Sequence, residues 1–428
     1  MRVRGAIAIL VLAAALVAGC GGGSASIAAT RRAAGLEEEK GRIEEEGGGI
    51  FAEGESGPRQ ILEGEMVAGE EGWVRTPSGV FWTPDGGRTW RTITPPVPSV
   101  GPLYFANPQD GWALDGMGRE GNARAFIFRT TDGGRTWDRT RLRGYDRIIP
   151  VASASFSLVG RHELFVLTKV EGDTASNFGP LFVSHDAGGH WRTLTSPPHS
   201  GTLSFQTPRR GWVAGGRPFQ SLYRTVDGGH TWEEIRPGRS IHSPPEERES
   251  FRPTRWTSYS TPLIGPDGHG IVGMVEAPVA EHPKITTRVV IWRTSDYGRT
   301  WRRSDRIDFP NTGSNYEAAE VFNRRGSDSL LVHDPLGGAY TVVGPDGKAG
   351  PLQPSYGLPH ESVEFTFSDD SHGFAFPSFG GHPSLSFTED GGRDWTQVPV
   401  PRAAPCRSAE PCDQPLPTER KDHQHQDH

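Results

Sequence analysis

The chain has 428 residues, a formal net charge of −7, 56 glycines, 36 prolines and three cysteines. The acidic balance argues against a general nucleic-acid binder, which would carry a basic stripe, and three cysteines are too few for a disulfide scaffold. The high glycine and proline content is typical of short strands joined by many turns, so we expect an all-β protein with no nucleic-acid partner and no cofactor.

Residues 1–19 have the pattern of a secretory signal. Arg2 and Arg4 precede an apolar run, Ala6–Ala18, and small residues follow it. These 13 residues are too few to span the hydrocarbon core of a bilayer, which needs about 20. The string Leu-Val-Ala-Gly-Cys that ends at Cys20 resembles the lipobox of bacterial lipoproteins. The resemblance implies lipidation of Cys20 and a membrane anchor outside the cytoplasm; an ordinary signal with an accidental cysteine is the alternative.

Residues 20–58 begin with glycine, serine and alanine and continue with acidic runs at Glu37–Glu39 and Glu44–Glu46. Large apolar side chains are scarce, so the segment cannot bury enough surface to offset the entropy lost on ordering. We therefore expect a flexible acidic tether.

An eight-residue segment, here called the box, recurs through residues 59–400. It is plainest at Thr130–Trp137 (TTDGGRTW), and its other copies begin at Thr83, Ser184, Thr225, Thr294 and Thr388. Each copy stands between short apolar runs, which predicts a strand, a tight turn and a strand. Glycine supplies positive φ, the aspartate can accept hydrogen bonds from the turn amides, and the tryptophan offers an apolar face to the next unit. We therefore assign structural roles to Asp85, Asp132, Asp186, Asp227, Asp296, Asp390, Trp90, Trp137, Trp191, Trp232, Trp301 and Trp395.

The spacing of the box aspartates predicts the number of units. Successive intervals are 47, 54, 41, 69 and 94 residues. The last interval is about twice the others, and Asp346, in the string Val-Gly-Pro-Asp-Gly-Lys, divides it into 50 and 44. Seven units of this length match the four-strand blades of a seven-bladed β-propeller; six blades are the alternative.

The box matches the Asp-box, Ser/Thr-x-Asp-x-Gly-x-Thr-Trp, so the chain resembles the bacterial-neuraminidase-repeat (BNR) proteins. Paired runs such as Leu103–Phe105 and Gly111–Ala113 precede the boxes. They make the chain more similar to the photosystem II stability/assembly-factor-like branch than to the classical sialidases. The resemblance implies box turns on a blade edge away from the ligand face, and an interaction role with a protein or glycan partner. We expect a monomer.

Function is expected on the face opposite the box turns. In a propeller, the crossovers between blades and the loops between second and third strands share that face, and loops on a rigid scaffold often carry function. Long inserts are expected there at 115–124, 169–177, 236–255 and 275–288. Their arginines favour an anionic partner, and the candidate contacts are Arg119, Arg124, Arg248, Arg252, Arg255 and Trp256. Ordinary solvated loops are the alternative, and Trp256 could equally lie in the first strand of its blade.

The competing interpretation is an extracellular glycoside hydrolase of the sialidase type. Sialidases resemble one another in an Arg-Ile-Pro motif ahead of the first box, an arginine triad, a tyrosine nucleophile with a glutamate partner, and an aspartate acid/base. No Arg-Ile-Pro precedes Asp85; the nearest string is Arg147–Pro150, and Tyr316–Glu317 is the one adjacent Tyr-Glu pair. We therefore name no catalytic residue and favour a non-catalytic binding or assembly platform.

Residues 401–428 form a proline- and histidine-rich tail that we expect to be disordered. Cys406 and Cys412 could form a disulfide in an exported protein, or remain two unpaired thiols. Their spacing matches no zinc motif. The alternating His and Asp residues at the end could chelate a transition metal, but we assign no metal site.

Overall fold

The computed structural model describes residues 60–402, except 98–99, 116–124, 143–150, 171–177, 195–196, 199–200, 216–220, 239–254, 279–286, 310–319, 335–337, 355, 359–362 and 378–383. Every regular element in the described part is a β-strand. A search of the same part for a helix long and apolar enough to cross a membrane found none.

The strands form seven antiparallel sheets, and each sheet uses strands that are consecutive in the chain. Blade 1 contains β1 (Glu63–Ala68), β2 (Glu71–Thr76), β3 (Gly79–Thr83) and β4 (Arg91–Thr92). Blade 2 contains β5 (Val100–Phe105), β6 (Gly111–Asp115), β7 (Phe126–Thr130) and β8 (Asp138–Arg141). Blade 3 contains β9 (Val151–Val159), β10 (Glu163–Val170), β11 (Phe178–Ser184) and β12 (Arg192–Leu194).

Blade 4 contains β13 (Thr202–Phe205), β14 (Gly211–Ala214), β15 (Leu222–Thr225) and β16 (Glu233–Ile235). Blade 5 contains β17 (Arg255–Tyr259), β18 (Leu263–Ile264), β19 (Gly270–Pro278), β20 (Thr287–Thr294) and β21 (Arg302–Phe309). Blade 6 contains β22 (Glu320–Asn323), β23 (Leu330–Asp334), β24 (Ala339–Val343) and β25 (Gln353–Pro354). Blade 7 contains β26 (Val363–Phe367), β27 (Gly373–Pro377), β28 (Leu385–Thr388) and β29 (Thr396–Val398).

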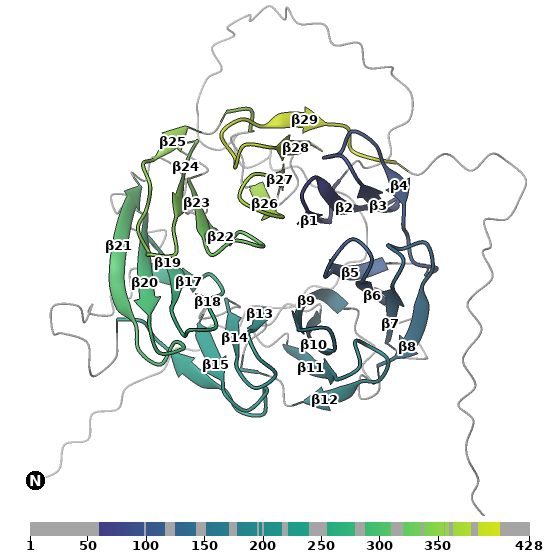
Figure 1. Cartoon of the computed structure of the whole chain (residues 1–428), viewed down its shortest axis with the longest axis horizontal. Helices are drawn as coiled ribbons and strands as arrows, with labels where there is room; N and C mark the ends of the chain where they lie inside the picture. Colours follow the sequence, from purple (N-terminus) through teal and green to yellow (C-terminus); the bar gives the residue numbers. More distant parts are fainter. Residues whose placement is uncertain are drawn as a thin grey trace, which may run out of the picture. The chain divides into compact units, whose positions relative to one another are not determined.

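The seven sheets are arranged radially, with the first strand of each blade innermost and the last outermost (Figure 1). This arrangement confirms the predicted seven-bladed β-propeller. The unit predicted from Asp346 is blade 6. The turn that contains Asp346 joins β24 to β25 and is closed by a hydrogen bond from Gly347 N to Gly344 O at 2.8 Å.

The ring closes where blade 7 packs on blade 1. The backbone N–H of Met66 donates to Thr366 Oγ1 at 3.1 Å, and Ser368 Oγ donates to Gly69 O at 2.6 Å. Phe374 and Phe387 of blade 7 share a buried cluster with side chains of blade 1. Because each blade is built from consecutive strands, packing rather than strand exchange holds the first blade to the last.

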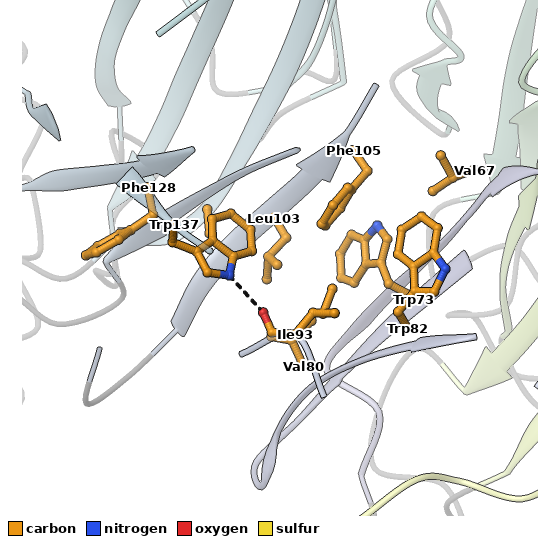
Figure 2. Close-up of a cluster of buried hydrophobic side chains, with 10 residues drawn as sticks. Val67, Trp73, Val80, Trp82, Ile93, Leu103, Phe105, Phe128 and Trp137 are labelled. Carbon is orange, nitrogen blue, oxygen red and sulfur yellow. Dashed lines mark hydrogen bonds between the residues drawn. The ribbon is translucent and has the colours of Figure 1, made fainter. Parts of the chain in front are cut away.

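The core lies between neighbouring blades. In the cluster that joins blades 1 and 2, Phe105 lies 6.4 Å from Trp73 and 5.1 Å from Trp82, measured between ring centroids. Trp137 completes this cluster, and its indole N–H donates to Ile93 O at 3.1 Å (Figure 2). Blades therefore adhere by buried aromatic area and by hydrogen bonds that cross the junction.

Strand order also divides the connections between two faces. In an antiparallel four-stranded sheet, the turn between strands one and two lies at the same end as the turn between strands three and four. Accordingly, the amide of Gly133 in the box donates to Gln109 O in the β5–β6 turn at 2.9 Å. We call this side the box face. The loops between second and third strands and the crossovers lie on the opposite side, the loop face.

Each of the four predicted inserts overlaps a strand at an end, and two overlap by more than one residue. β19 continues to Pro278 and β20 starts at Thr287, so 275–278 and 287–288 belong to the sheet of blade 5. β10 likewise includes Lys169 and Val170. The prediction was wrong at these ends because continued pairing satisfies backbone groups that a loop would leave to water.

Candidate functional site

The box turns are closed by their aspartates, as the blade 2 copy shows. Asp132 Oδ1 accepts from Thr130 Oγ1 at 2.8 Å, Thr136 N at 2.9 Å and Arg135 N at 3.0 Å. Oδ2 accepts from Thr136 Oγ1 at 2.6 Å. Partial burial raises the pKa of Asp132, but these hydrogen bonds outweigh it and hold the pKa at about 2. The carboxylate is thus committed to the turn.

Four of the other five boxes repeat this geometry, with one substitution of partner. Asp85, Asp227 and Asp296 each bind the threonine four residues on through Oδ2, at 2.6–2.7 Å. At Asp186 the partner is the ring of His190, 2.6 Å away. At every box aspartate, burial raises the pKa, but the hydrogen bonds lower it by more. All six pKa values therefore lie below the ordinary one.

The box tryptophans lie at the junction with the preceding blade. Trp90 of blade 1 stacks on Phe374 of blade 7 at 6.3 Å, and Trp301 of blade 5 meets Trp212 of blade 4 edge-on at 6.0 Å. Trp191, Trp232 and Trp395 pack in the clusters between blades 2 and 3, 3 and 4, and 6 and 7.

Replacing Asp132 with alanine is expected to lower the free energy of unfolding by about 1–3 kcal/mol, since the amides of Arg135 and Thr136 lose their acceptor. Thermal melting would measure the loss, with Asp138→Ala on the adjacent exposed strand position as the control. An unchanged melting temperature for Asp132→Ala would contradict the role of the carboxylate in the turn.

The lowered pKa values predict a loss of stability in acid. Asp132, Asp186 and Asp227 have pKa values of about 2, against an ordinary value of 3.8 for an aspartate. Their contribution is present above pH ~4, where the unfolded-state carboxylates are also ionised, and disappears as pH falls towards 2. Urea unfolding midpoints measured at pH 6, 4, 3 and 2 should therefore decline mainly from pH 4 to pH 2. The decline should be less steep in Asp132→Asn.

The box of blade 7 departs from the others at one position. Asp394 stands where a threonine or histidine otherwise binds Oδ2. Asp390 Oδ1 accepts from Thr388 Oγ1 at 2.9 Å and from the amides of Arg393 and Asp394. No donor to Oδ2 is found among the described residues, so this box has an open acceptor.

Asp394→Thr is therefore expected to raise the free energy of unfolding by about 0.5–1.5 kcal/mol, because it supplies the missing donor and removes a second carboxylate from the turn. The reverse change, Thr136→Asp in the intact box of blade 2, should destabilise by a similar amount. Differential scanning calorimetry of both variants checks the pair, and equal shifts of the same sign would refute the explanation.

Charged side chains also meet along the inner strands. Glu63 on β1 pairs with Arg75 on β2 at 3.2 Å, and burial raises the pKa of Glu63 to about 7 although Arg75 lowers it. Glu65, two residues on, pairs at 2.6 Å with Arg325 from the β22–β23 turn. Burial likewise raises the pKa of Glu65, with Arg325 acting in the opposite direction.

Arg325 connects blades that lie on different sides of the ring. Besides Glu65 of blade 1, its guanidinium donates to Phe105 O at 2.7 Å and Ala106 O at 2.8 Å, at the end of β5 in blade 2. It also lies over the ring of Tyr104, 5.6 Å from the centroid. The β22–β23 turn of blade 6 thus reaches towards the centre of the ring (Figure 1).

Sequence reasoning did not single out this inner cluster. One signal was available, since Glu63 and Glu65 are alternating charges within a strand that is otherwise half-buried. Alternating residues on a strand share a face, so the sequence predicts that the two carboxylates lie close together. No pattern near Arg325 in the sequence indicates that it pairs with Glu65.

The predicted ligand-face residues are placed only in part. Arg119, Arg124, Arg248 and Arg252 lie outside the described residues, as do Cys20, Cys406 and Cys412. Arg255 and Trp256 belong to β17, the innermost strand of blade 5, where their backbones pair with Pro278 and Ala277. The alternative that Trp256 lies in the first strand of its blade therefore holds.

The described part of the chain is thus a seven-bladed β-propeller with hydrogen-bonded turns on one face. No protein-family model and no curated protein sequence matches the chain. Among solved structures it is similar to YCF48 bound to a D1 peptide, with 18% identity, a TM-score of 0.38, and coverage of 70% of this chain and 83% of that one. It is also similar to an ancestral GH74 enzyme (14%, TM-score 0.46, 80% and 46%) and to virginiamycin B lyase from Staphylococcus aureus (12%, TM-score 0.43, 77% and 91%). All three are below 25% identical to this chain, and function must be argued from the chain's own residues.

Proposed function

We propose that the protein is a lipid-anchored, extracytoplasmic β-propeller that binds a protein partner through its loop face, without catalysis. In this proposal it is an Asp-box repeat protein of the photosystem II assembly-factor-like kind, with an interaction role and no implied link to photosynthesis. The observation that carries it is the division of the ring into two faces, with the box turns on one side and the connections of variable length on the other.

The two faces differ in what they leave free for binding. On the box face, five of the six box carboxylates have hydrogen-bond partners on both oxygens, so these turns serve as rigid supports. The longest inserts of the sequence connect strand ends that lie on the loop face, and their sequences contain Arg119, Arg124, Arg248 and Arg252. Arginine binds carboxylates through paired hydrogen bonds, which favours a partner with acidic groups.

Two measurements test the proposal. Cys20→Ser should release the full-length chain from membranes. Partner capture by chemical crosslinking in intact cells should fall when Arg119, Arg124, Arg248 and Arg252 are all replaced by alanine, and should persist for the box-face control Arg135→Ala. Capture that is unaffected by the fourfold change, or lost in the control, would contradict binding at the loop face.

Glycoside hydrolysis remains a second candidate because of one specific observation. Glu63 has a pKa of about 7, raised by burial, which suits a general acid near neutral pH, and Glu65 lies on the same face of β1. A panel of fluorogenic sialosides and other glycosides would test this candidate. Turnover by the full-length chain that disappears in Glu63→Gln would replace the non-catalytic proposal.

A further inference from the structure

A hollow with a volume of about 260 Å³ lies between blades 6 and 7. Its walls come from β24 and the residues leading into β25, from the β26–β27 turn, and from the box turn of blade 7. It is therefore separate from the loop face and does not depend on the function proposed above.

The junction between blades 6 and 7 also lacks one close packing contact that other junctions have. The second glycine of a box is the point of close approach to the preceding blade. A Cβ placed there would lie 2.8 Å from Val398 at Gly87, 2.7 Å from Ile93 at Gly134 and 2.9 Å from Leu181 at Gly229. At Gly188 and Gly298 the neighbours are Trp112 and Trp212 of the preceding blade.

Gly392 has no such neighbour. The three atoms nearest to a Cβ there belong to Trp395 and Phe367 of its own blade, the closest of each at 3.5 and 3.7 Å. Blade 6 has the degenerate box, and its short outer strand β25 contains Gln353 and Pro354, whereas the outer strand of blade 7 contains Val398. Polar side chains are prominent in the lining of the hollow at this junction.

The lining carries no net charge. Arg324 and Arg393 are balanced by Asp370 and Asp390, and Arg324 pairs with Asp370 at 3.3 Å. A ligand with a net charge would thus leave one lining charge opposed to it and gain little over water. This arrangement favours a neutral occupant.

Hydrogen-bonding groups of both kinds face the space. Asp390 Oδ2 is an acceptor without a donor among the described residues. The Tyr340 hydroxyl donates to Gln353 Oε1 at 3.3 Å and also interacts with the Arg393 side chain, while the Gln353 amide group and most of the Arg393 guanidinium retain donors. A suitable ligand must therefore both donate and accept.

The surroundings add exposed apolar surface. Leu352 and Tyr356 are 51% and 62% exposed, and they are two of the five large hydrophobic residues that the described part of the chain leaves exposed. Leu352 adjoins Gln353, and Tyr356 forms a bridge with Asp394 beside the box. Both residues are close in the chain to lining residues but do not themselves line the hollow.

We propose that the hollow between blades 6 and 7 binds a single neutral sugar residue. Hydroxyl groups are donors and acceptors at once, and a neutral sugar ring has no net charge to oppose either sign in the lining. A space of this size is below the usual range for drug-sized ligands, which suits one ring better than a length of peptide chain.

The test uses the full chain in phosphatidylcholine nanodiscs, which contain no sugar. Saturation-transfer difference NMR at millimolar ligand would examine glucose, galactose, xylose and N-acetylglucosamine, with the blocked peptide N-acetyl-Ala-Gly-Ala-amide as a second arm. We expect binding of at least one sugar. Gln353→Leu, which replaces a polar lining side chain with an apolar one, should weaken it at least tenfold.

Arg393→Ala should also weaken sugar binding, whereas Arg135→Ala, at the same box position in blade 2, should leave it unchanged. Melting temperatures verify that each variant is folded, and Gln353→Leu should melt no lower than the parent. Binding that survives both hollow variants, binding of the peptide alone, or no binding of any sugar would each overturn the proposal.

Discussion

Replacing Trp137 with alanine should lower the free energy of unfolding by about 3–5 kcal/mol, the range seen when a large aromatic side chain is removed from a core. The side chain is 7% exposed and lies between blades 1 and 2. Its ring meets Phe105 edge-on at 6.1 Å. Its indole N–H is the donor to Ile93 O, so alanine would leave both a cavity and a buried carbonyl without a partner.

Chemical denaturation of three proteins would measure this effect. Trp137→Phe keeps most of the aromatic area but removes the N–H, so it should lose about 1–2 kcal/mol. Arg135→Ala, two residues away on the exposed part of the turn, serves as the control. A loss below ~1 kcal/mol for Trp137→Ala would show that neighbouring side chains move to fill the cavity, and that Trp137 is not required for close packing of blades 1 and 2.

Replacing Arg325 with alanine should destabilise the ring by about 2–4 kcal/mol. Breaking a buried ion pair by removing one partner commonly costs about 3–5 kcal/mol, and we discount this range because the Arg325 and Glu65 side chains are 25% and 22% exposed. The carbonyls of Phe105 and Ala106 also lose their donor.

The loss should depend on pH with a definite sign. The pKa of Glu65 is raised in the folded chain by burial and restrained by Arg325, so removal of the arginine raises it further. A folded-state pKa above the unfolded one means that stability falls as pH rises through that interval. The deficit of Arg325→Ala should therefore be larger at pH 8 than at pH 5.

A double-mutant cycle isolates the pair. Adding Glu65→Gln to Arg325→Ala removes the unpaired carboxylate and should recover part of the stability and most of the pH dependence. Arg303→Ala, on the exposed outer strand β21, is the control and should change little. A pH-independent loss in Arg325→Ala would exclude the ion pair as its cause.

The repeat architecture was predictable because its determinants are local. The box turn is closed by contacts that reach no more than four residues along the chain, such as those from Thr130 and Thr136 to Asp132. Their sequence pattern therefore survives wherever the turn does. Even blade 6, whose box is degenerate, could be placed by the spacing around Asp346, since its Asp and Gly still form a turn between strands.

Only the tertiary structure decided what happens where blades meet. Arg325 and Glu65 are separated by 260 residues, and no periodic pattern connects them. The hollow between blades 6 and 7 likewise depends on side chains that come from both blades. The sequence determined the blades and their turns because each is specified by neighbours in the chain, whereas the inner cluster and the hollow arise from packing between units that the ring brings together.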